Sequence, residues 1–225
     1  MKPKRITLFM GHYGSGKTFT AVNYAVSIKQ KVDKVSIYDL DIVNPYFRTV
    51  DAKNFLDEKG VELIVSPFAE TNVDIPAMNS ASYKMISDLS SYAVVDVGGD
   101  DRGALALGRF SEKIIEENNY DAFLVVNKYR PETRDIEGVK QIIREITLTG
   151  KLPFTGIVNN TNLGNETTSE DVLAGIEFCK NVSTETGLEF KFSSVRKDLV
   201  DEVIKQGIDK DKILSVDPIK YGNWI

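Results

Sequence analysis

The sequence predicts an α/β fold of three layers, in which a mostly parallel sheet of about seven or eight strands carries helices on both faces. Two observations lead to this prediction. Short runs rich in β-branched residues alternate along the chain with longer stretches whose apolar residues recur at helical spacing. This alternation is typical of parallel sheets, because parallel neighbours are joined by crossover connections that are usually helical. The chain has 225 residues, enough for one such core, so we expect a single domain over residues 1–225.

The predicted strands and helices follow one another in order. The strands cover residues 6–10, 35–38, 61–65, 92–97, 122–126, 154–158, 189–192 and 213–216. The helices cover residues 19–30, 51–59, 78–90, 103–118, 132–148, 168–186 and 197–206. Residues 66–80, which contain Pro67 and Pro76, are the longest stretch with neither pattern, and we expect a partner or substrate to contact this segment.

The first connection carries the most specific motif. Residues 6–10 form an apolar run suited to a strand buried on both faces, and residues 19–30 carry apolar side chains at helical spacing. Between them, residues 11–18 read Gly-His-Tyr-Gly-Ser-Gly-Lys-Thr and complete the pattern G-x-x-x-x-G-K-[ST] of a phosphate-binding loop. This context directs the helix N-terminus, with its unpaired N–H groups, toward the bound phosphates.

The chemistry of this motif assigns roles to its residues. Glycines let the backbone N–H groups surround an anion, the amine of Lys17 reaches the β- and γ-phosphates, and the hydroxyl of Thr18 ligates Mg²⁺. We therefore predict a P-loop NTPase fold with Mg²⁺ as a cofactor. The predicted nucleotide contacts are Gly11, His12, Tyr13, Gly14, Ser15, Gly16, Lys17, Thr18 and Phe19.

Acidic residues follow two other predicted strands. The second strand leads into Asp39-Leu40-Asp41, and at a P-loop site Asp41 could hold a magnesium-bound water or orient the attacking water. The other interpretation of Asp41 is a turn residue. Asp96 ends an apolar strand and is predicted to hold the magnesium sphere, while Gly99 offers a backbone N–H near the γ-phosphate. No glutamate follows Asp96, which disfavours the motor and helicase classes.

Asparagines follow the fifth and sixth predicted strands. Guanine-specific sites usually read N-K-x-D, but residues 127–130 end in Arg130 and residues 159–162 end in Asn162. The sequence therefore favours adenine over guanine. An asparagine amide can pair with the adenine edge through a donor and an acceptor, so Asn159 is the predicted base contact. The alternative is an asparagine that only stabilises a turn.

Composition disfavours several classes of protein. The net charge of −5 argues against a surface that coats nucleic acid, and no apolar run approaches the ~18 residues of a membrane span. One cysteine and one histidine leave no Cys/His cluster for zinc or an iron–sulfur centre within the chain. Residues 1–5 lead directly into the first strand without a secretory signal, so we expect a cytoplasmic protein with no membrane anchor.

With these residues in place, the chain resembles the MinD/ParA group of P-loop ATPases, which includes the nitrogenase iron protein. Residues 16–25, Gly-Lys-Thr-Phe-Thr-Ala-Val-Asn-Tyr-Ala, are similar to the group's G-K-T-T-T-A-V-N-L-A run. Asp39-Leu40-Asp41 resembles its D-x-D segment, whose second acid is hydrolytic, and this resemblance gives Asp41 that role. Residues 96–100 resemble the D-V-x-G-D of the iron protein. Residues 195–198 lie where the group has its adenine loop, which implies that Val195 and Arg196 contact the nucleotide.

The resemblance implies an ATPase that acts as a nucleotide-dependent switch, binds ATP and ADP, forms a homodimer with ATP and acts on a protein effector. The chain departs from the group at three places. His12 replaces the lysine that acts across the dimer, so His12 is either a catalytic residue or only shapes the loop. Gly103 stands where the iron protein has a cluster-ligating cysteine, and the adenine loop lacks the group's proline.

A phosphotransferase is the second hypothesis, because kinases with similar sheets also use an acid after the second strand. Asp41 would then activate an acceptor hydroxyl of a small molecule or polynucleotide, and residues 46–48, Tyr-Phe-Arg, would bind the acceptor. Arg130 and Arg134 are candidates for the cationic lid of a kinase, but the sequence shows no compact arginine-rich lid. A metal-insertion GTPase is disfavoured by the scarcity of His and Cys.

Overall fold

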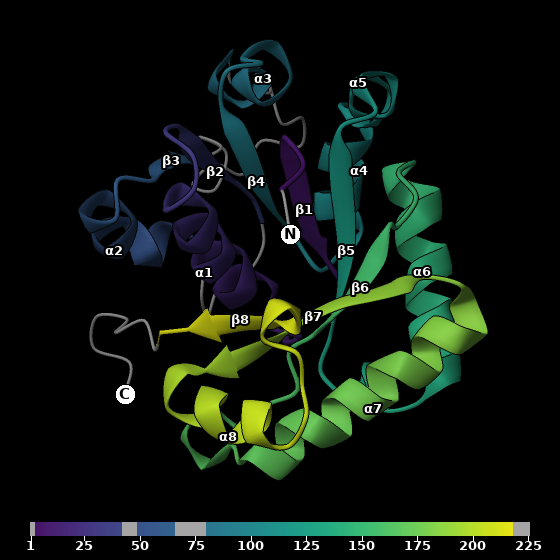
Figure 1. Cartoon of the computed structure of the whole chain (residues 1–225). Coiled ribbons are helices and arrows are strands. Elements are labelled where there is room, and N and C mark those ends of the chain that lie inside the picture. Colours follow the sequence, from purple (N-terminus) through teal and green to yellow (C-terminus); the bar gives the residue numbers. More distant parts are fainter. Residues whose placement is uncertain (1–2, 42–48, 66–79, 218–225) are drawn as a thin grey trace.

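An eight-stranded parallel sheet lies at the centre of the structure (Figure 1). This computed structural model describes residues 3–41, 49–65 and 80–217. The strands are β1 (Ile6–Met10), β2 (Val35–Leu40), β3 (Glu62–Val65), β4 (Tyr92–Val97), β5 (Tyr120–Val126), β6 (Gly156–Asn159), β7 (Glu189–Arg196) and β8 (Ile213–Val216). Their order is β3-β2-β4-β1-β5-β6-β7-β8, and every neighbouring pair is parallel. The predicted α/β fold is confirmed.

Helices connect the strands and cover both faces of the sheet. The α-helices are α1 (Lys17–Lys29), α2 (Lys53–Glu58), α3 (Ser80–Ser87), α4 (Asp101–Gly108), α5 (Ser111–Glu117), α6 (Ile136–Gly150), α7 (Ser169–Thr186) and α8 (Val200–Lys205). Short 3-10 turns are η1 (Thr49–Ala52), η3 (Pro131–Thr133), η4 (Gly164–Glu166), η5 (Lys197–Leu199) and η6 (Lys210–Lys212). Within the described ranges, none of these helices has the length and apolar character needed to cross a membrane.

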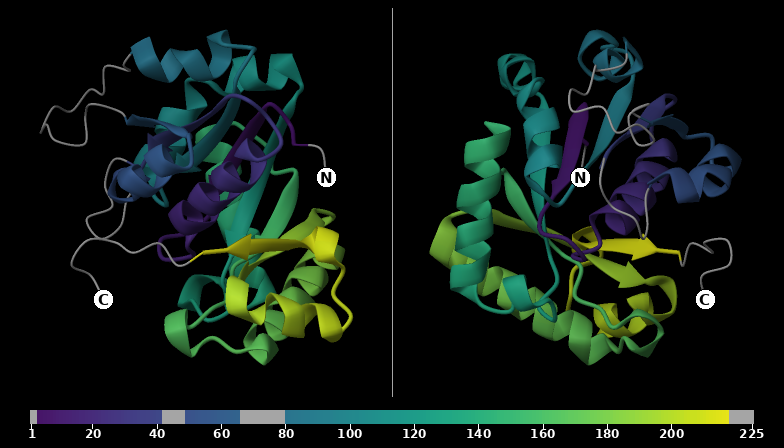
Figure 2. Two further views of the ribbon diagram at one scale, coloured as in Figure 1. Left: turned by 60° about the vertical axis from the view of Figure 1, so that its left-hand side comes forward. Right: turned by 180° about the vertical axis from the view of Figure 1, so that it is seen from behind.

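Alternation within the strands divides the core into two hydrophobic clusters. In β1, Ile6, Leu8 and Met10 belong to a cluster with α4, α5, α6 and α7, whereas Phe9 belongs to a cluster with α1 and α2. These four side chains are at most 1% exposed, so β1 is buried on both faces, as its apolar run predicted. Figure 2 shows the strong twist between β2 and β8, which is the twist expected of an open parallel sheet.

The helix predicted over residues 103–118 is wrong as a single element. The chain forms α4 and α5 instead, because it turns at Arg109 and buries Phe110 completely. The Phe110 ring meets Tyr83 of α3 edge-on, with 5.5 Å between ring centroids. Most of the predicted irregular segment 66–80, and the predicted acceptor residues 46–48, lie outside the described residues.

Two aspartates fix the starts of helices on one face of the sheet. Asp100 accepts a hydrogen bond from the N–H of Gly103 at 3.0 Å and begins α4. Asp135 accepts from the N–H of Gly138 at 2.9 Å, so α6 begins at residue 136 rather than at the predicted residue 132. β7 extends to Arg196, four residues beyond the predicted strand, which places residues 195 and 196 at a strand end.

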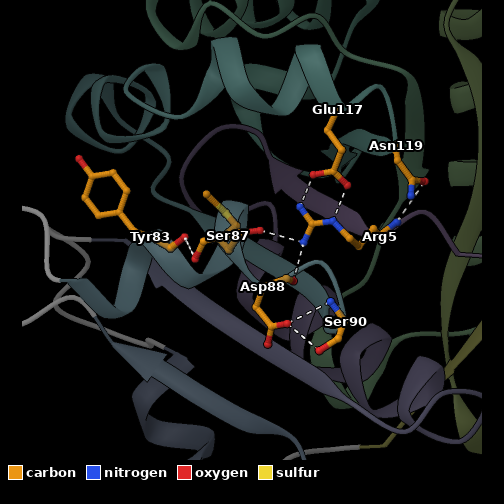
Figure 3. Close-up of polar contacts among 8 residues, drawn as sticks. Arg5, Tyr83, Ser87, Asp88, Ser90, Glu117 and Asn119 are labelled. Carbon is orange, nitrogen blue, oxygen red and sulfur yellow. Dashed lines mark hydrogen bonds and ion pairs between the residues drawn. The ribbon is translucent and has the colours of Figure 1, made fainter.

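A buried arginine joins β1 to two helices at the opposite end of the sheet from the phosphate-binding motif (Figure 3). Arg5 is 6% exposed and forms a two-point ion pair with Glu117 of α5. Its Nη1 atom donates to the backbone oxygens of Met85, at 2.9 Å, and Asp88, at 3.2 Å. One guanidinium therefore satisfies acceptors from two segments, α5 and the end of α3.

We expect Arg5→Met to destabilise the protein by about 3 kcal/mol, because it leaves the Glu117 carboxylate partly buried without a partner and two carbonyl oxygens without a donor. Urea unfolding measures the change. Lys53→Met is the matched control, since it removes the exposed Lys53–Asp57 pair, which should contribute less than about 1 kcal/mol. Equal stabilities of the two variants would contradict the structural role of Arg5.

Candidate nucleotide-binding site

The phosphate-binding loop, residues 11–16, connects the end of β1 to the start of α1. Gly16 has a φ of +85°, and a Cβ there would overlap the side-chain amide of Asn160, so glycine is required at this position. Helix α1, which is described in full, begins with neither a capping side chain nor an acidic residue in its first turn. Its first N–H groups therefore have no side chain competing with an anion.

The ammonium group of Lys17 is buried between the loop and the acids that follow the neighbouring strands. Lys17 is 5% exposed, and its Nζ donates to the backbone oxygen of His12 at 3.1 Å. Burial lowers the pKa of Lys17, while the charges of Asp96, Asp41 and Asp100 act against this shift. The carboxylates thus favour the charged amine that a phosphate site needs.

The loop after β4 packs directly against this amine. A Cβ at Gly99 would lie 2.8 Å from the Nζ of Lys17, and a Cβ at Gly103 would lie 2.6 Å from the Cα of Gly98. Only residues without a side chain allow these approaches. Because Asp100 caps α4 within the same loop, the start of α4 is tied to the position of the Lys17 amine.

Asp96, the penultimate residue of β4, carries a fully buried carboxylate. Its Oδ2 accepts from the hydroxyl of Thr49 at 2.8 Å, whereas its Oδ1 has no hydrogen-bond partner in the described part of the chain. Burial raises the pKa of Asp96 to about 7, and the charge of Asp39, which lies opposite it on β2, adds to the rise. The hydroxyls of Thr18 and Thr49 and the ammonium of Lys17 lower this pKa. An oxygen of this kind is suited to a cation.

Asp41 lies just beyond β2, at the same edge of the sheet. It is 4% exposed, its N–H donates to the Oδ1 of Asp39 at 3.0 Å, and a Cβ at Gly98 would lie 3.2 Å from its Oδ1. The structure therefore gathers four predicted site residues at the carboxyl ends of β1, β2 and β4, where parallel sheets bind ligands: Lys17, Thr18, Asp41 and Asp96.

Two cavities lie beside the loop and share Phe19. The larger, of about 480 Å³, is lined by His12, Tyr13, Gly14, Gly16, Lys17, Thr18, Phe19, Arg130, Pro131 and Glu132. The smaller, of about 260 Å³, is lined by Phe19, Asn160, Thr161, Asn162, Gly164, Asn165, Thr167, Val172, Ser194, Arg196 and Val216. Gly11 and Ser15 line neither cavity, and both are buried within the loop.

Asn159 is placed differently from its neighbour Asn160. Asn159 is fully buried, and its amide donates to the Oγ of Ser193, at 2.7 Å, and the backbone oxygen of Val172, at 3.2 Å. Both of its N–H groups are thus used inside the protein, and it does not line the smaller cavity. Asn160 does line it, and its Nδ2 donates to the backbone oxygen of Ser15 at 2.8 Å. The geometry places Asn160, not Asn159, beside the phosphate-binding loop.

The structure also separates the two residues predicted at the adenine loop. Val195 is fully buried in the hydrophobic core, so its side chain does not reach the smaller cavity. Arg196 lines that cavity and is held by Asp198 at 2.6 Å and by the backbone oxygens of residues 164 and 165, both at 3.0 Å. Because side chains alternate along β7, Ser194 lines the cavity in place of Val195.

His12 lies at the edge of the larger cavity. Its Nδ1 is 3.7 Å from the Oε2 of Glu132, and both side chains are about two-fifths exposed, at 39% and 43%. An exposed pair at this distance contributes little to stability. The catalytic role of His12 stays a prediction.

The sequence suggested Arg130 only as a candidate for the lid of a kinase, together with Arg134, and it suggested no role for Asn160. The alternation of β6 could have revealed Asn160, because Val158 belongs to the cluster of α1 and Ile157 to the opposite cluster, so residue 160 shares the face of α1. The sequence does not distinguish Arg130 from Arg134, since the position of each depends on how the turn after β5 folds onto residues 11–18.

Comparison with solved structures identifies the same fold in FtsY proteins. The cell division protein FtsY of Thermotoga maritima superposes with a TM-score of 0.59 and 17% identity, over 86% of this chain and 62% of that protein. FtsY of Elizabethkingia anophelis in complex with GDP gives a TM-score of 0.54 and 18% identity, over 87% of this chain and 57% of that protein. This chain thus spans about three fifths of these FtsY chains, and at such identities the likeness shows the fold alone.

Sequence comparison gives the family. A search of curated proteins found no match. The family model of the CobQ/CobB/MinD/ParA nucleotide binding domain, CbiA, matches residues 6–170, which include the loop, Asp41, Asp96 and Asn160. On this match and on the site described above, the chain belongs to the CobQ/CobB/MinD/ParA family of P-loop nucleotide-binding domains.

Proposed function

We propose that this chain binds Mg-ATP, hydrolyses it and acts as a nucleotide-dependent switch. One observation carries the proposal: the buried amine of Lys17 lies among the carboxylates of Asp41 and Asp96 and against Gly99. The amine supplies a charge for the β- and γ-phosphates, and Asp96 supplies a ligand on the metal side. Asp41 is buried beside the same loop, and we assign it to the attacking water.

Magnesium fits the residues present. Asp96 offers a buried oxygen with no partner in the described chain, and the Thr18 hydroxyl lowers the pKa of the same carboxyl. Among the described residues, no group of three or more His, Cys, Asp or Glu side chains could hold a metal by itself. Mg²⁺ is usually bound by one or two carboxylates together with phosphates, so Thr18, Asp96 and the nucleotide would hold it jointly. When bound, it neutralises charge on the phosphates.

The loop after β4 supports the switch part of the proposal. Because Gly99 packs against the Lys17 amine, a γ-phosphate bound to this amine would hold residues 97–103, and its loss would release them. Because Asp100 caps α4, a movement of residues 97–103 would also move the start of α4. We assign recognition of the ATP state to a protein effector or a second copy of this chain that contacts this region.

The smaller cavity is the proposed base site. Asn160 uses its Nδ2 to hold the loop, which leaves its Oδ1 to accept from the amino group of adenine. The FtsY structure from Elizabethkingia anophelis contains GDP, so the likeness in fold does not favour adenine, and the preference for adenine rests on the residues of this chain. Residues 160–163 read Asn-Thr-Asn-Leu and lack the aspartate of the N-K-x-D motif, which supports adenine.

The kinase alternative shares this site and differs in the acceptor. Of the two arginines considered for a lid, only Arg130 lines the larger cavity. Arg134 is 74% exposed and lies 3.8 Å from Asp135. Because one of the two candidate lid arginines lies away from the cavity, we favour hydrolysis over transfer to an acceptor.

Lys17→Ala tests the proposed function. We expect ATP turnover to fall at least about 100-fold, because a charge that contacts the transferred phosphoryl group is lost. Steady-state phosphate release measures the change. Lys113→Ala, which removes an exposed lysine on α5, should leave turnover unchanged. Wild-type turnover in Lys17→Ala would remove the central claim.

Asp41→Asn and Asp96→Asn should separate hydrolysis from metal binding. We expect Asp41→Asn to bind Mg-ATP normally but turn it over about 100-fold more slowly, since the water loses its orienting base. Asp96→Asn should lose the magnesium-dependent part of ATP affinity. Calorimetric titration with and without Mg²⁺ measures both, with exposed Asp57→Asn as the control. The opposite pattern in the two variants would reverse the assigned roles.

The proposed base site predicts that ATP displaces a bound fluorescent nucleotide more strongly than GTP does. Asn160→Ala should weaken the binding of ATP about tenfold, since it removes both a hydrogen bond to the base and the hydrogen bond that holds the backbone of Ser15. Asn181→Ala, on the exposed face of α7, is the control. Stronger displacement by GTP than by ATP would refute the preference for adenine.

A further inference from the structure

The guanidinium of Arg130 lies over the phosphate-binding loop. A Cβ at Gly14 would lie 3.4 Å from both the Cζ and the Nε of Arg130 and 3.7 Å from its Nη1. The guanidinium therefore lies about one methyl group away from the backbone at Gly14. Arg130 also lines the larger cavity together with Lys17 and Thr18, so a cation from the turn after β5 reaches the site that binds phosphates.

The turn that carries Arg130 is held by hydrogen bonds to Asn127, which is 2% exposed. The Oδ1 of Asn127 accepts from the N–H of Tyr129 at 3.0 Å, and its backbone oxygen accepts from the N–H of Arg130 at 3.0 Å and from the hydroxyl of Thr133 at 2.5 Å. Pro131 then starts η3 with a restricted φ. The backbone of Arg130 is thus held in place before any ligand binds.

The charge of Arg130 is not used elsewhere in the described chain. Its guanidinium forms no ion pair or hydrogen bond with the described residues, and Glu132, on the same turn, lies toward His12 instead. The cavity that it faces also holds the amine of Lys17 and the first N–H groups of α1. Glu132 also lines this cavity, at the side of His12. The cation of Arg130, the amine of Lys17 and the N–H groups of α1 together are suited to an anion with several oxygens.

We propose that Arg130 supplies, within the same chain, a second cation for the phosphates of the bound nucleotide. This inference rests on the proposed function, because it assigns Arg130 to the same nucleotide. Lys17 is the first residue of α1, and its amine lies against Gly99 of the loop after β4, whereas Arg130 comes from the turn after β5 and lies over Gly14. The two cations therefore reach the loop from different elements. A cation supplied in this way stabilises the charge that develops during phosphoryl transfer, so the site does not depend on a cation from a second copy.

Three variants of the full chain test the proposal. Arg130→Ala should lower kcat about 100- to 1,000-fold. In calorimetric titration it should weaken the binding of ATP and ADP about tenfold, while the affinity for AMP, which lacks the β- and γ-phosphates, stays unchanged. Arg130→Lys should restore the affinity but not kcat, because an ammonium keeps the charge and loses the two-point fork. Arg144→Ala, an exposed arginine on α6, should match the wild type. Turnover per wild-type chain should also be independent of protein concentration.

The outcomes separate this inference from the function on which it rests. If Arg130→Ala had the turnover and the ATP affinity of the wild type, the role of Arg130 alone would be overturned. Turnover per chain that rises with protein concentration would overturn the claim that the second cation comes from the same chain. A wild-type chain that neither binds nor hydrolyses ATP would overturn the proposed function and this inference with it.

Discussion

The burial of the Lys17 ammonium among carboxylates is the interaction on which the rest of the site depends. A buried ammonium is costly unless opposite charges surround it, and Asp96, Asp41 and Asp100 supply these charges. The same burial raises the pKa of Asp96 to about 7, because desolvation and the charge of Asp39 both disfavour its ionised form. A phosphate and a divalent cation would add the charges that complete this cluster, which explains why one site would need both together.

This cluster of charges also restricts which residue types can occupy the loop after β4. Any side chain at residue 99 would collide with the Lys17 amine, and any side chain at residue 103 would collide with the backbone of residue 98. The glycines after β4 are therefore set by the volume that the lysine and the start of α4 occupy. Because the loop of residues 98–103 packs against the Lys17 amine at Gly99, a ligand that binds to this amine would also change the position of these residues.

Sequence patterns predicted the strands, the loop and Asp96 because these depend on local order. Apolar runs, glycine spacing and an acid at a strand end are all visible without knowledge of neighbours in space. The break between α4 and α5 was not predicted, because it depends on the burial of Phe110 against α3. The side chains of Asn159 and Val195, both predicted nucleotide contacts, lie on the opposite side of their strands from the smaller cavity, because side chains alternate along β6 and β7. The sequence suggested both Arg130 and Arg134 near the phosphates, and only the fold of the turn after β5 separates them, because Arg130 lines the cavity and Arg134 is exposed.

The strand order divides the site into two chemically different halves. On one side of β1 lie β4 and β2, with Asp96 near the end of β4 and Asp41 just beyond β2, and on the other lie β5 and β6, which lead into Arg130 and Asn160. Phosphate oxygens cannot approach carboxylates directly, so the acidic half becomes useful only with a metal ion between them. The other half offers a guanidinium and an amide, which contact a nucleotide without an intermediary. A nucleotide that lies across the loop would therefore have its metal on the side of β2 and β4 and its base on the side of β6. This polarity follows from the strand order and from the residues at the strand ends.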